Sequence, residues 1–548
     1  MDQVHPTEDE QYGYYSGLPS RPRLLARSST QPWTEMHGGI PRPQHYLAPI
    51  YYRTLRPPGA HSIADSWNDP EGPLRVSLLH ALQGFPWTAI DWCRVGVEEA
   101  CRVGPEQAYP AHSTFELTLL VSVRPNLVSL VDASEAVHQC KAIIESYGFM
   151  DIHCEIRESS VSLLVDDTTT SEPTTQGMEL IHKVPTDRQF DMYDFNSMIG
   201  TEIAMLKRPD VTATKGLYIQ GKYLGQQYTA ALTCRHLLTA SIDDTIDLEP
   251  MKPGQTVGDM DLSVIQWGDD KPRKRLVELQ ELLDDLAGDQ RPVWELKPAK
   301  VEADRNLRKA YEDMAAPIAR LHNARDRVFG KVLLSPSISL KPQGSGVTNQ
   351  WFMDWMLIQL DASRHEEELS QLDNTLTLSQ GEIKAAAKAV GTNKFSDLLK
   401  KQMYQDQQHG DTISFPLRGF MSVNDMRYPK GHTKYEDERA TRVGKFGAKS
   451  HLTFGYASTF KSVVRTSFDN FTMPSEVWPV ITSRKSEFSQ SGDSGSCVWA
   501  LDGRIAGIVI AGIGKLDPKN EAYADITYVM PIEVYLEDMK RWGFEGVV

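Results

Sequence analysis

The stretch "EFSQSGDSGSCVWALDGRIAGIVIAG", residues 487–512, decides how the rest of the chain is interpreted. Ser494 stands within Gly-Asp-Ser-Gly, and two strand-like runs follow it on either side of Asp502-Gly503. An Asp-Gly pair between such runs is a strong signal for a β-hairpin. The serine is therefore expected on a tight turn that leads into a hairpin. The nucleophilic serine of an α/β-hydrolase leads into a helix instead, and no helical pattern follows Ser494.

A serine hydroxyl is a weak nucleophile, so a catalytic Ser494 needs a base within hydrogen-bond reach and a third group that orients the base. The candidate base is His236, which follows a short apolar, threonine-rich run in "YTAALTCRHLLTA". The candidate acid is Asp354, which precedes the apolar run 355–358. A carboxylate that leads a buried strand needs a partner, and a histidine N–H supplies one. Asp261, in "GDMDLSVIQW", has the same local setting and remains the alternative, with Asp354 favoured.

Three of these motifs resemble those of the trypsin-like (chymotrypsin-fold) serine peptidases, in the same order along the chain. "TCRH", "DWMLIQL" and "GDSGS" are similar to the His, Asp and Ser motifs of that family. "RVGKFGAKSHLTFGYAS" resembles a strand pair between the Asp and the Ser, and "DITYVMPIEVYLEDMKRW" resembles the final strand and C-terminal helix. The variant pattern is most similar to uncharacterised intracellular trypsin-like proteins of filamentous fungi. The resemblance covers roughly residues 195–545 and implies a mainly β, chymotrypsin-like double β-barrel.

The resemblance implies a catalytic role for each matching residue. Ser494 would attack the scissile carbonyl, and His236 would take its proton and return it to the leaving amine. Asp354 would hold the imidazole tautomer and stabilise the imidazolium. The backbone N–H groups of Gly492 and Ser494 would form the oxyanion hole, where a residue without a side chain suits the turn. No metal or other cofactor is expected.

The resemblance also places a substrate pocket. Phe488 would lie near the base of the pocket, and its wall strand would hold Ile510, Ala511 and Gly512. No acid stands at the base position, so the expected preference is for a neutral side chain. Asp525 would reverse this preference if it faced inward.

The aspartate before the serine is the main departure from the family pattern. In many secreted members, an activating cleavage frees an Ile-Val-Gly-Gly terminus whose amine pairs with that aspartate. No such segment precedes His236, so Asp493 needs another partner or the oxyanion loop forms only on binding. The family's disulfide cysteines are also missing. The intervals from His236 to Asp354 and from Asp354 to Ser494 are long, and predicted helical insertions account for the excess.

The chain divides into four predicted segments. Residues 1–72 are rich in Pro, Gly, Tyr, Arg and Ser and are expected to be mostly disordered. Residues 73–165 show an α-β-β-α-β order typical of a small α+β domain, which we interpret as regulatory or interacting. Residues 166–194 are a polar linker, and residues 195–548 form the peptidase domain. Helical stripes at about 270–330 and 364–408 interrupt this domain, and they and residues 73–165 are candidate surfaces for a regulatory protein.

Composition restricts the class of partner and the cellular setting. The net charge of -15, from 73 acidic and 58 basic residues, argues against a nucleic acid or an anionic membrane. No apolar run reaches about 18 residues, so no membrane span is expected. "MDQVHPTEDEQYGYYSG" lacks the features of a signal peptide, and six cysteines without a C-x-x-C pair favour a reduced setting. We therefore predict a cytoplasmic serine endopeptidase that performs limited proteolysis on a protein or peptide. The alternative is a catalytically silent peptidase-fold protein that binds or scaffolds partners.

Overall fold

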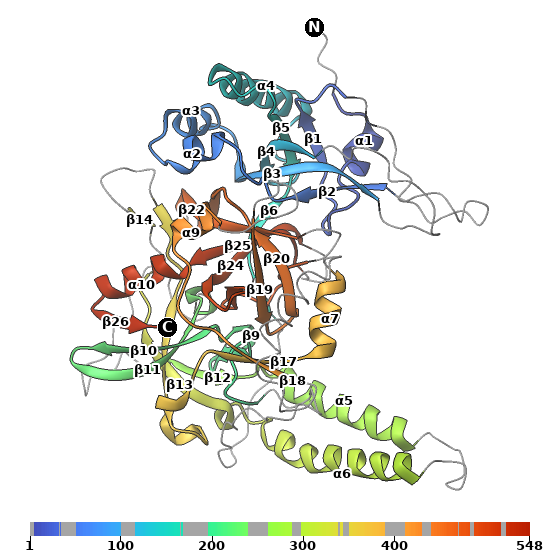
Figure 1. Cartoon of the computed structure of the whole chain (residues 1–548), viewed down its shortest axis with the longest axis vertical. Coiled ribbons are helices and arrows are strands. Elements are labelled where there is room, and N and C mark those ends of the chain that lie inside the picture. Colours follow the sequence, from blue (N-terminus) through green and yellow to red (C-terminus); the bar gives the residue numbers. More distant parts are fainter. Residues whose placement is uncertain are drawn as a thin grey trace.

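The computed structural model describes residues 5–31, 33, 51–99, 115–164, 166–167, 195–238, 261–287, 298–337, 340–342, 350–389, 412–429, 440–468, 471–482, 487–516 and 522–548. The N-terminal region lies at one end of the molecule, and the strands from β19 (Thr441–Gly447) to β25 (Ala522–Pro531) occupy its middle (Figure 1). Two long helices, α5 (Asp270–Ala287) and α6 (Pro298–Arg320), extend at the other end (Figure 1). In the described part of the chain, no helix combines the length and the apolar character needed to cross a membrane.

In the first 72 residues, expected to be mostly disordered, the described parts contain two helices and two strands, and residues 1–4, 32 and 34–50 lie outside the described part of the chain. Tyr14 and Tyr15 are buried, and their hydroxyls donate to the Glu155 carboxylate at 2.6 and 2.5 Å. These tyrosines are therefore ordered by packing against a strand that is distant in the chain. The local amino-acid composition gives no sign of that contact. The elements are α1 (Glu8–Gly13), β1 (Leu24–Arg27), β2 (Tyr51–Arg56) and α2 (Ile63–Asn68).

Residues 73–158 have the predicted order of helices and strands: α3 (Pro73–Ala81), β3 (Trp87–Glu99), β4 (Glu116–Val123), α4 (Leu130–Ser146) and β5 (His153–Glu158). Ser129 is the N-cap of helix α4, and its hydroxyl accepts from the Asp132 N–H at 3.1 Å. Just after the helix, Gly148 has a φ of 88°, which glycine adopts without strain.

The N-terminal sheet continues into the sheet of the remaining chain. Strand β3 pairs antiparallel with β21 (Ser462–Phe468), where Ile90 lies opposite Val463. Beside this junction the buried Asp91 carboxylate accepts from the Ser462 hydroxyl at 2.5 Å and from the Tyr528 hydroxyl at 3.0 Å. The two halves of the molecule therefore share both a β-ladder and a buried polar contact.

Asp91→Asn is expected to stabilise the protein above pH 6 and to have little effect near pH 4. Burial raises the pKa of Asp91 from 3.8 to about 6, although Ser462, Arg157 and Tyr528 favour the anion. The folded chain thus binds this proton more tightly than the unfolded chain, so its contribution to stability is full below pH 4 and is lost as the pH rises to about 6. The loss is about 3 kcal/mol. Thermal unfolding midpoints at pH 4.5 and pH 8 measure it.

The control for this prediction is Asp151→Asn, which removes a carboxylate whose side chain is 72% exposed. We expect it to give no gain at pH 8. An equal midpoint for wild type and Asp91→Asn at pH 8 would contradict the assigned cost of the buried charge.

Six antiparallel strands close into a ring in the C-terminal part of the chain. Each pairs with the next, and the last pairs with the first, in the order β19 (Thr441–Gly447), β20 (His451–Ala457), β22 (Phe471–Ile481), β25 (Ala522–Pro531), β24 (Ile505–Leu516) and β23 (Cys497–Ala500). The hairpin predicted around Asp502-Gly503 is β23 with β24, and Gly503 has a φ of 89°. The prediction of a mainly β molecule is confirmed.

A second sheet has nine strands and is open at both ends among the described residues, so a double barrel stays a prediction. Its order is β26 (Phe544–Val547), β10 (Leu217–Tyr223), β11 (Gln226–Thr233), β16 (Met356–Leu360), β13 (Val328–Leu334), β12 (Ser263–Gln266), β8 (Glu202–Met205), β9 (Arg208–Thr214) and β7 (Asp166–Asp167). Helix α10 (Ile532–Arg541) joins β25 to β26, as the predicted final strand and helix require.

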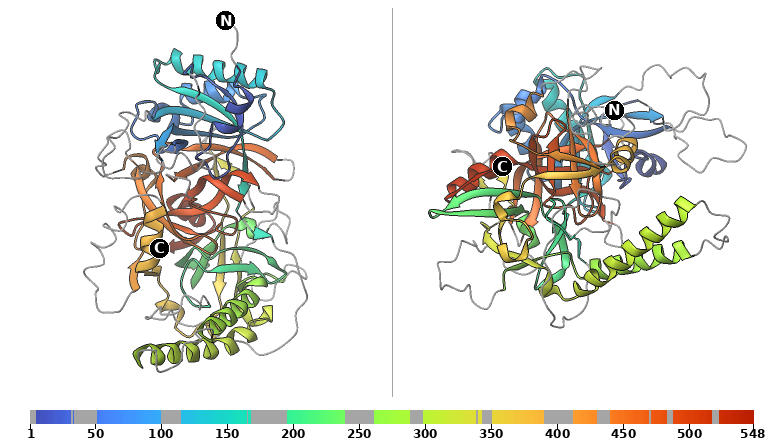
Figure 2. Two further views of the ribbon diagram at one scale, coloured as in Figure 1. Left: turned by 90° about the vertical axis from the view of Figure 1, so that its right-hand side faces the viewer. Right: turned by 60° about the horizontal axis from the view of Figure 1, so that its bottom comes forward.

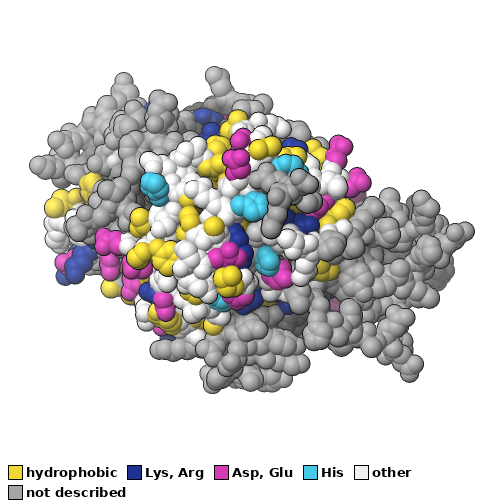
Figure 3. All heavy atoms as spheres, turned by 90° about the horizontal axis from the view of Figure 1, so that it is seen from above, with side chains coloured by type: hydrophobic (Ala, Val, Ile, Leu, Met, Phe, Trp, Pro, Cys, Tyr) yellow, Lys and Arg dark blue, Asp and Glu magenta, His cyan; other side chains and the backbone are white. Residues whose placement is uncertain are grey.

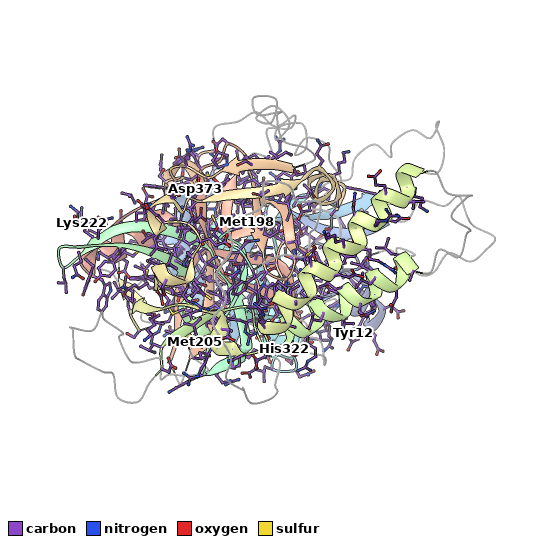
Figure 4. All side chains as sticks on the ribbon, turned by 90° about the horizontal axis from the view of Figure 1, so that it is seen from below. Tyr12, Met198, Met205, Lys222, His322 and Asp373 are labelled. Atoms are coloured by element: carbon purple, nitrogen blue, oxygen red, sulfur yellow. The ribbon has the colours of Figure 1, made fainter. Side chains whose placement is uncertain are left out.

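The helical insertion at about 270–330 is a hairpin of α5 (Asp270–Ala287) and α6 (Pro298–Arg320), which run side by side in two views (Figures 1 and 2). Seen from below, the α5–α6 hairpin lies on the side of the molecule opposite to Lys222 (Figure 4).

Among its described residues, the insertion predicted at 364–408 is α-helical only in α7 (Gln380–Ala389), with one short 3₁₀ turn at Leu369–Gln371. Strand β17 (Thr375–Ser379) precedes α7 and pairs with β18 (Thr412–Pro416), because "TLTLS" alternates apolar and polar side chains as a half-buried strand does. Residues 390–408 lie outside the described part of the chain.

Candidate active site

His236 and Asp354 meet because their two strands are neighbours. His236 lies in a short 3₁₀ turn just after β11, and Asp354 lies just before β16; these strands pair with Thr233 opposite Met356. The Asp354 Oδ2 is 2.5 Å from His236 Nδ1, and the Asp354 Oδ1 accepts from the His236 backbone N–H at 2.9 Å. Both side chains are fully buried. Asp354, and not Asp261, therefore contacts His236; the Asp261 carboxylate instead accepts from the Ser263 N–H at 3.1 Å.

The environment of His236 favours the imidazolium. Burial alone lowers its pKa, but the adjacent Asp354 carboxylate and, to a smaller degree, Cys234 more than offset this and raise the pKa above its ordinary value. Tyr535 donates to the Asp354 backbone carbonyl at 2.7 Å and helps to fix the turn that carries the acid. The pair is thus built to accept a proton on the imidazole.

Ser494 lies on a turn that only glycine permits at two positions. Gly492 and Gly495 have φ of 95° and 90°, which other residues adopt at a cost. A Cβ on Gly495 would lie 2.3 Å from both the Thr214 carbonyl oxygen and the Thr233 hydroxyl. The Gly-Asp-Ser-Gly sequence therefore forms this turn because its glycines allow both the backbone angles and the close approach of β9 and β11.

Thr214, at the end of β9, joins the histidine strand to the serine turn. Its N–H donates to the Ser494 carbonyl at 2.8 Å, and its own carbonyl accepts from the Thr233 hydroxyl at 2.7 Å. Its hydroxyl donates to the Gly492 carbonyl at 2.9 Å. Nothing in the local sequence "DVTATKG" marks this role of Thr214.

Asp493 has the partner that the sequence left open. The Lys445 Nζ, on β19, is 3.2 Å from the Asp493 carboxylate, and both side chains are fully buried. The carboxylate also accepts from the Ser450 hydroxyl at 2.5 Å and from the Lys449 and Gln490 N–H groups at 3.0 and 2.9 Å. Burial opposes the Asp493 charge, but Lys445 and these donors hold its pKa below the ordinary value. In the sequence, the lysine within the apolar, glycine-containing "RVGKFG" is the signal that could have identified this partner of Asp493.

The two predicted oxyanion donors converge on one backbone oxygen. The Gly492 and Ser494 N–H groups both donate to the Leu164 carbonyl, at 2.6 and 3.2 Å. The Leu164 N–H donates to Ser494 Oγ at 3.1 Å, and Ser494 Oγ donates to the Ile510 carbonyl at 3.1 Å. A peptide group of the chain itself thus occupies the position that the sequence assigned to a substrate.

The predicted wall residues Ile510, Ala511 and Gly512 lie on β24, beside this peptide. Strand β6 (Ser160–Leu163) pairs antiparallel with β24. A Cβ on Gly512 would lie 3.4 and 3.5 Å from the two methyl carbons of Leu164, so the Leu164 side chain packs at the wall position.

Two further residues considered for the pocket, Phe488 and Asp525, are buried. Phe488 is 1% exposed and packs near Gly455. Asp525 is fully buried, but it accepts from the Ser20 hydroxyl at 2.5 Å and pairs with Arg157 at 3.1 Å, so its carboxylate is already neutralised by the N-terminal region. Among the described residues, no group of three or more His, Cys, Asp and Glu side chains is arranged to hold a metal ion.

Comparison with protein-family models gives no match, and comparison with curated proteins gives none either. Among solved structures, the chain is similar to a glutamic acid specific serine protease with a histidine triad in substrate binding, at 10% identity and a TM-score of 0.25, over 64% of this chain and 100% of that one. A Nocardiopsis protease matches at 10% identity and a TM-score of 0.25, over 64% and 98%. Cellulomonas bogoriensis chymotrypsin matches at 11% identity and a TM-score of 0.21, over 40% and 75%. These three solved structures are proteases.

Proposed function

We propose that the chain is a serine endopeptidase that cleaves protein or peptide substrates in limited proteolysis within the cell. The observation that carries the proposal is the convergence of the Gly492 and Ser494 N–H groups on a single peptide carbonyl, directly beside the Ser494 hydroxyl. Two fixed donors at one oxygen stabilise the charge that develops when a carbonyl is attacked, and each contributes about 3 kcal/mol. The buried Asp354–His236 contact supplies the proton acceptor that such an attack needs.

In the proposed mechanism the Ser494 hydroxyl turns from the Ile510 carbonyl toward His236 and attacks the substrate carbonyl as His236 removes its proton. Catalytic hydrogen bonds of this kind often tighten only with substrate in place. Asp354 keeps the proton of the neutral imidazole on Nδ1 and stabilises the imidazolium that forms. His236 then protonates the leaving amine. Water next attacks the acyl group on Ser494 while His236 takes a proton from the water. His236 returns this proton to Ser494 Oγ as the acyl group is released.

The Lys445–Asp493 pair has a structural part in this proposal. Asp493 precedes the nucleophile, and its bonds to Lys445, Ser450 and the Lys449 N–H hold the turn that aims the Ser494 N–H. The oxyanion donors are therefore preformed without an activating terminus. Of the two expectations, another partner for Asp493 or a loop that forms only on binding, this proposal takes the first.

One observation favours the alternative of a silent binding or scaffold protein: the Leu164 carbonyl occupies both donors in the intact chain. Residues 73–165 are the proposed regulatory or interaction domain in either case. The described part of the face seen from above carries acidic, basic, histidine and apolar side chains interspersed (Figure 3).

A fluorophosphonate probe separates the two functions. We expect covalent labelling of the wild-type chain, and faster labelling of Leu164→Asp, because a charge on the buried Leu164 side chain disfavours occupancy of the donors. Ser494→Ala is expected to abolish labelling. Ser491→Ala, which removes a nearby hydroxyl from the same turn, is the matched control and should retain it. Absence of labelling in both wild type and Leu164→Asp would favour the scaffold.

A further inference from the structure

We propose that the first substrate of this site is the chain's own peptide bond between Leu164 and Val165, and this proposal rests on the proposed peptidase function. It identifies both the sequence that the site accepts and the event that separates residues 1–164 covalently from the remainder.

The segment 160–164 is bound as an added strand. Strand β6 pairs with β24 in antiparallel register, with Gly512 opposite Ser162 and Ala511 opposite Leu163. This is the way in which an extended peptide binds to a sheet edge, where the ladder gives affinity and alternate side chains enter pockets. Leu164, the next residue, is fully buried against Gly512.

Two backbone N–H donors and the Ser494 hydroxyl lie around the Leu164 carbonyl. Its oxygen accepts from the Gly492 and Ser494 N–H groups at 2.6 and 3.2 Å, and the N–H of the same residue lies 3.1 Å from Ser494 Oγ. The carbonyl carbon is covalently bonded to that oxygen and is one Cα away from that nitrogen, so it lies beside the hydroxyl. The chain therefore places the carbonyl group of one specific residue at the nucleophile.

The chain is also held on the leaving side of the bond. Asp166 and Asp167 form β7 and pair antiparallel with β9, where they lie opposite Thr212 and Val211. Strand β9 ends at Thr214, whose N–H donates to the Ser494 carbonyl. The backbone is thus fixed before the bond by β24 and after it by the strand that supports the nucleophile turn.

The N-terminal region delivers this segment to the site. Ser159 joins β5 to β6: its carbonyl accepts from the Thr88 hydroxyl at 3.0 Å, and its hydroxyl donates to the Gly514 carbonyl at 3.1 Å. Because both partners of the reaction belong to one folded chain, the step is unimolecular and gains the large effective concentration of an oriented intramolecular reaction.

Water is the only further reactant that the proposed cleavage needs. Ser494 Oγ forms a bond to the Leu164 carbonyl carbon while its proton passes to His236 Nε2. The bond from that carbon to the Val165 nitrogen breaks, and His236 protonates the released amine. Water then hydrolyses the acyl-Ser494, which leaves a carboxylate on Leu164 and a free amine on Val165.

After cleavage we expect residues 1–164 to stay bound to the remainder. The β3–β21 ladder, the Arg157–Asp525 pair and the buried Asp91 contacts with Ser462 and Tyr528 cross the junction, and none of them involves the cleaved bond. The site then opens to other substrates only when the segment ending at Leu164 leaves β24. In this proposal the N-terminal region is first a tethered substrate and then, while it stays bound, an inhibitor of the site.

The test is to express the full chain and to identify its fragments by intact mass and N-terminal sequencing. We expect wild type to yield a fragment that ends at Leu164 and a fragment that begins Val165-Asp166-Asp167, at a rate independent of protein concentration. Ser494→Ala should remain one chain, because loss of the nucleophile alone lowers kcat about 10⁶-fold in a triad enzyme. Leu164→Asp should be cut at least about tenfold more slowly, whereas the volume-conserving Leu164→Met should be cut nearly as wild type.

The outcomes separate this proposal from the proposed function. A wild-type chain that stays intact while Leu164→Asp labels with a fluorophosphonate at Ser494 overturns self-cleavage and leaves the peptidase function standing. Serine-dependent cleavage at another bond overturns the assignment to Leu164. Absence of both cleavage and labelling in every variant overturns the peptidase function itself. Circular dichroism of Ser494→Ala and Leu164→Met verifies that each is folded, and a folded Ser494→Ala chain that is still cut also overturns the proposal.

Discussion

Asp354→Asn is expected to slow the acylation of Ser494 about 10⁴-fold at neutral pH, with little change in the fold. Asp354 accepts from both the ring and the backbone N–H of His236. An asparagine presents an amide N–H at one of these positions and stabilises the wrong tautomer, so the imidazole no longer offers its acceptor nitrogen to the serine. The rate of fluorophosphonate labelling measures the effect, with Leu164→Asp as the common background.

The same substitution has a defined effect on pH dependence. The base must be neutral to act, and Asp354 raises the pKa of His236 against the lowering effect of burial. The labelling rate of the parent chain should therefore rise with pH over the range in which the imidazolium deprotonates, and Asp354→Asn should shift that rise to lower pH. Asp261→Asn is the matched control and should change neither the rate nor the profile. A rate for Asp354→Asn within tenfold of its parent would contradict the assigned role.

Lys445→Met is expected to destabilise the protein by about 3–5 kcal/mol, because it leaves the fully buried Asp493 carboxylate without its cation. The turn that carries Gly492 and Ser494 should lose its fixed form, so we also expect labelling of Ser494 to fall at least about 100-fold, the loss typical of one misplaced oxyanion donor. Thermal unfolding and the labelling rate measure the two effects.

Two further variants make the Lys445 result specific. Lys449→Met removes a neighbouring side chain that is 27% exposed and keeps the backbone N–H that donates to Asp493, so it should behave nearly as wild type. Adding Asp493→Asn to Lys445→Met removes the uncompensated charge and should recover part of the stability. An unfolding midpoint for Lys445→Met equal to that of wild type would show that Asp493 does not depend on this cation.

The sequence predicted those features that depend on local pattern. The hairpin around Asp502-Gly503 follows from turn chemistry, and the α5–α6 hairpin follows from leucine periodicity. The choice of Asp354 over Asp261 also agrees with the contact in the structure, because a carboxylate before a fully buried strand needs a partner. Each of these inferences uses residues that are close in the chain.

The features that the sequence did not predict depend on contacts between distant segments. "SVSLLVDD" contains no sign that Leu164 meets Gly492 and Ser494, more than 300 residues away in the chain. Residues near the N-terminus have a composition typical of disorder, yet Tyr14 and Tyr15 are ordered by Glu155. Strand β17 replaces part of the predicted 364–408 helix block for the same reason. Its partner β18 lies beyond α7, so the pairing is not visible in the local sequence.

The position of the Leu164 carbonyl changes the regulatory question. Asp493 already pairs with the buried Lys445, so in the proposed mechanism the oxyanion donors form without a new terminus. In the same proposal, access is determined by β6, which pairs with β24 and follows β5 of the N-terminal sheet. Ligands or substitutions that weaken the junction between β3 and β21 are therefore the expected means of control.

Mapping the probe adduct by peptide mass spectrometry tests the central claim most directly. We expect a fluorophosphonate to modify Ser494 in the Leu164→Asp chain, and we expect denaturation of the chain or His236→Ala to prevent the modification. An adduct on another serine with Ser494 unmodified, or no adduct under native conditions, would contradict the assignment of Ser494 as the nucleophile.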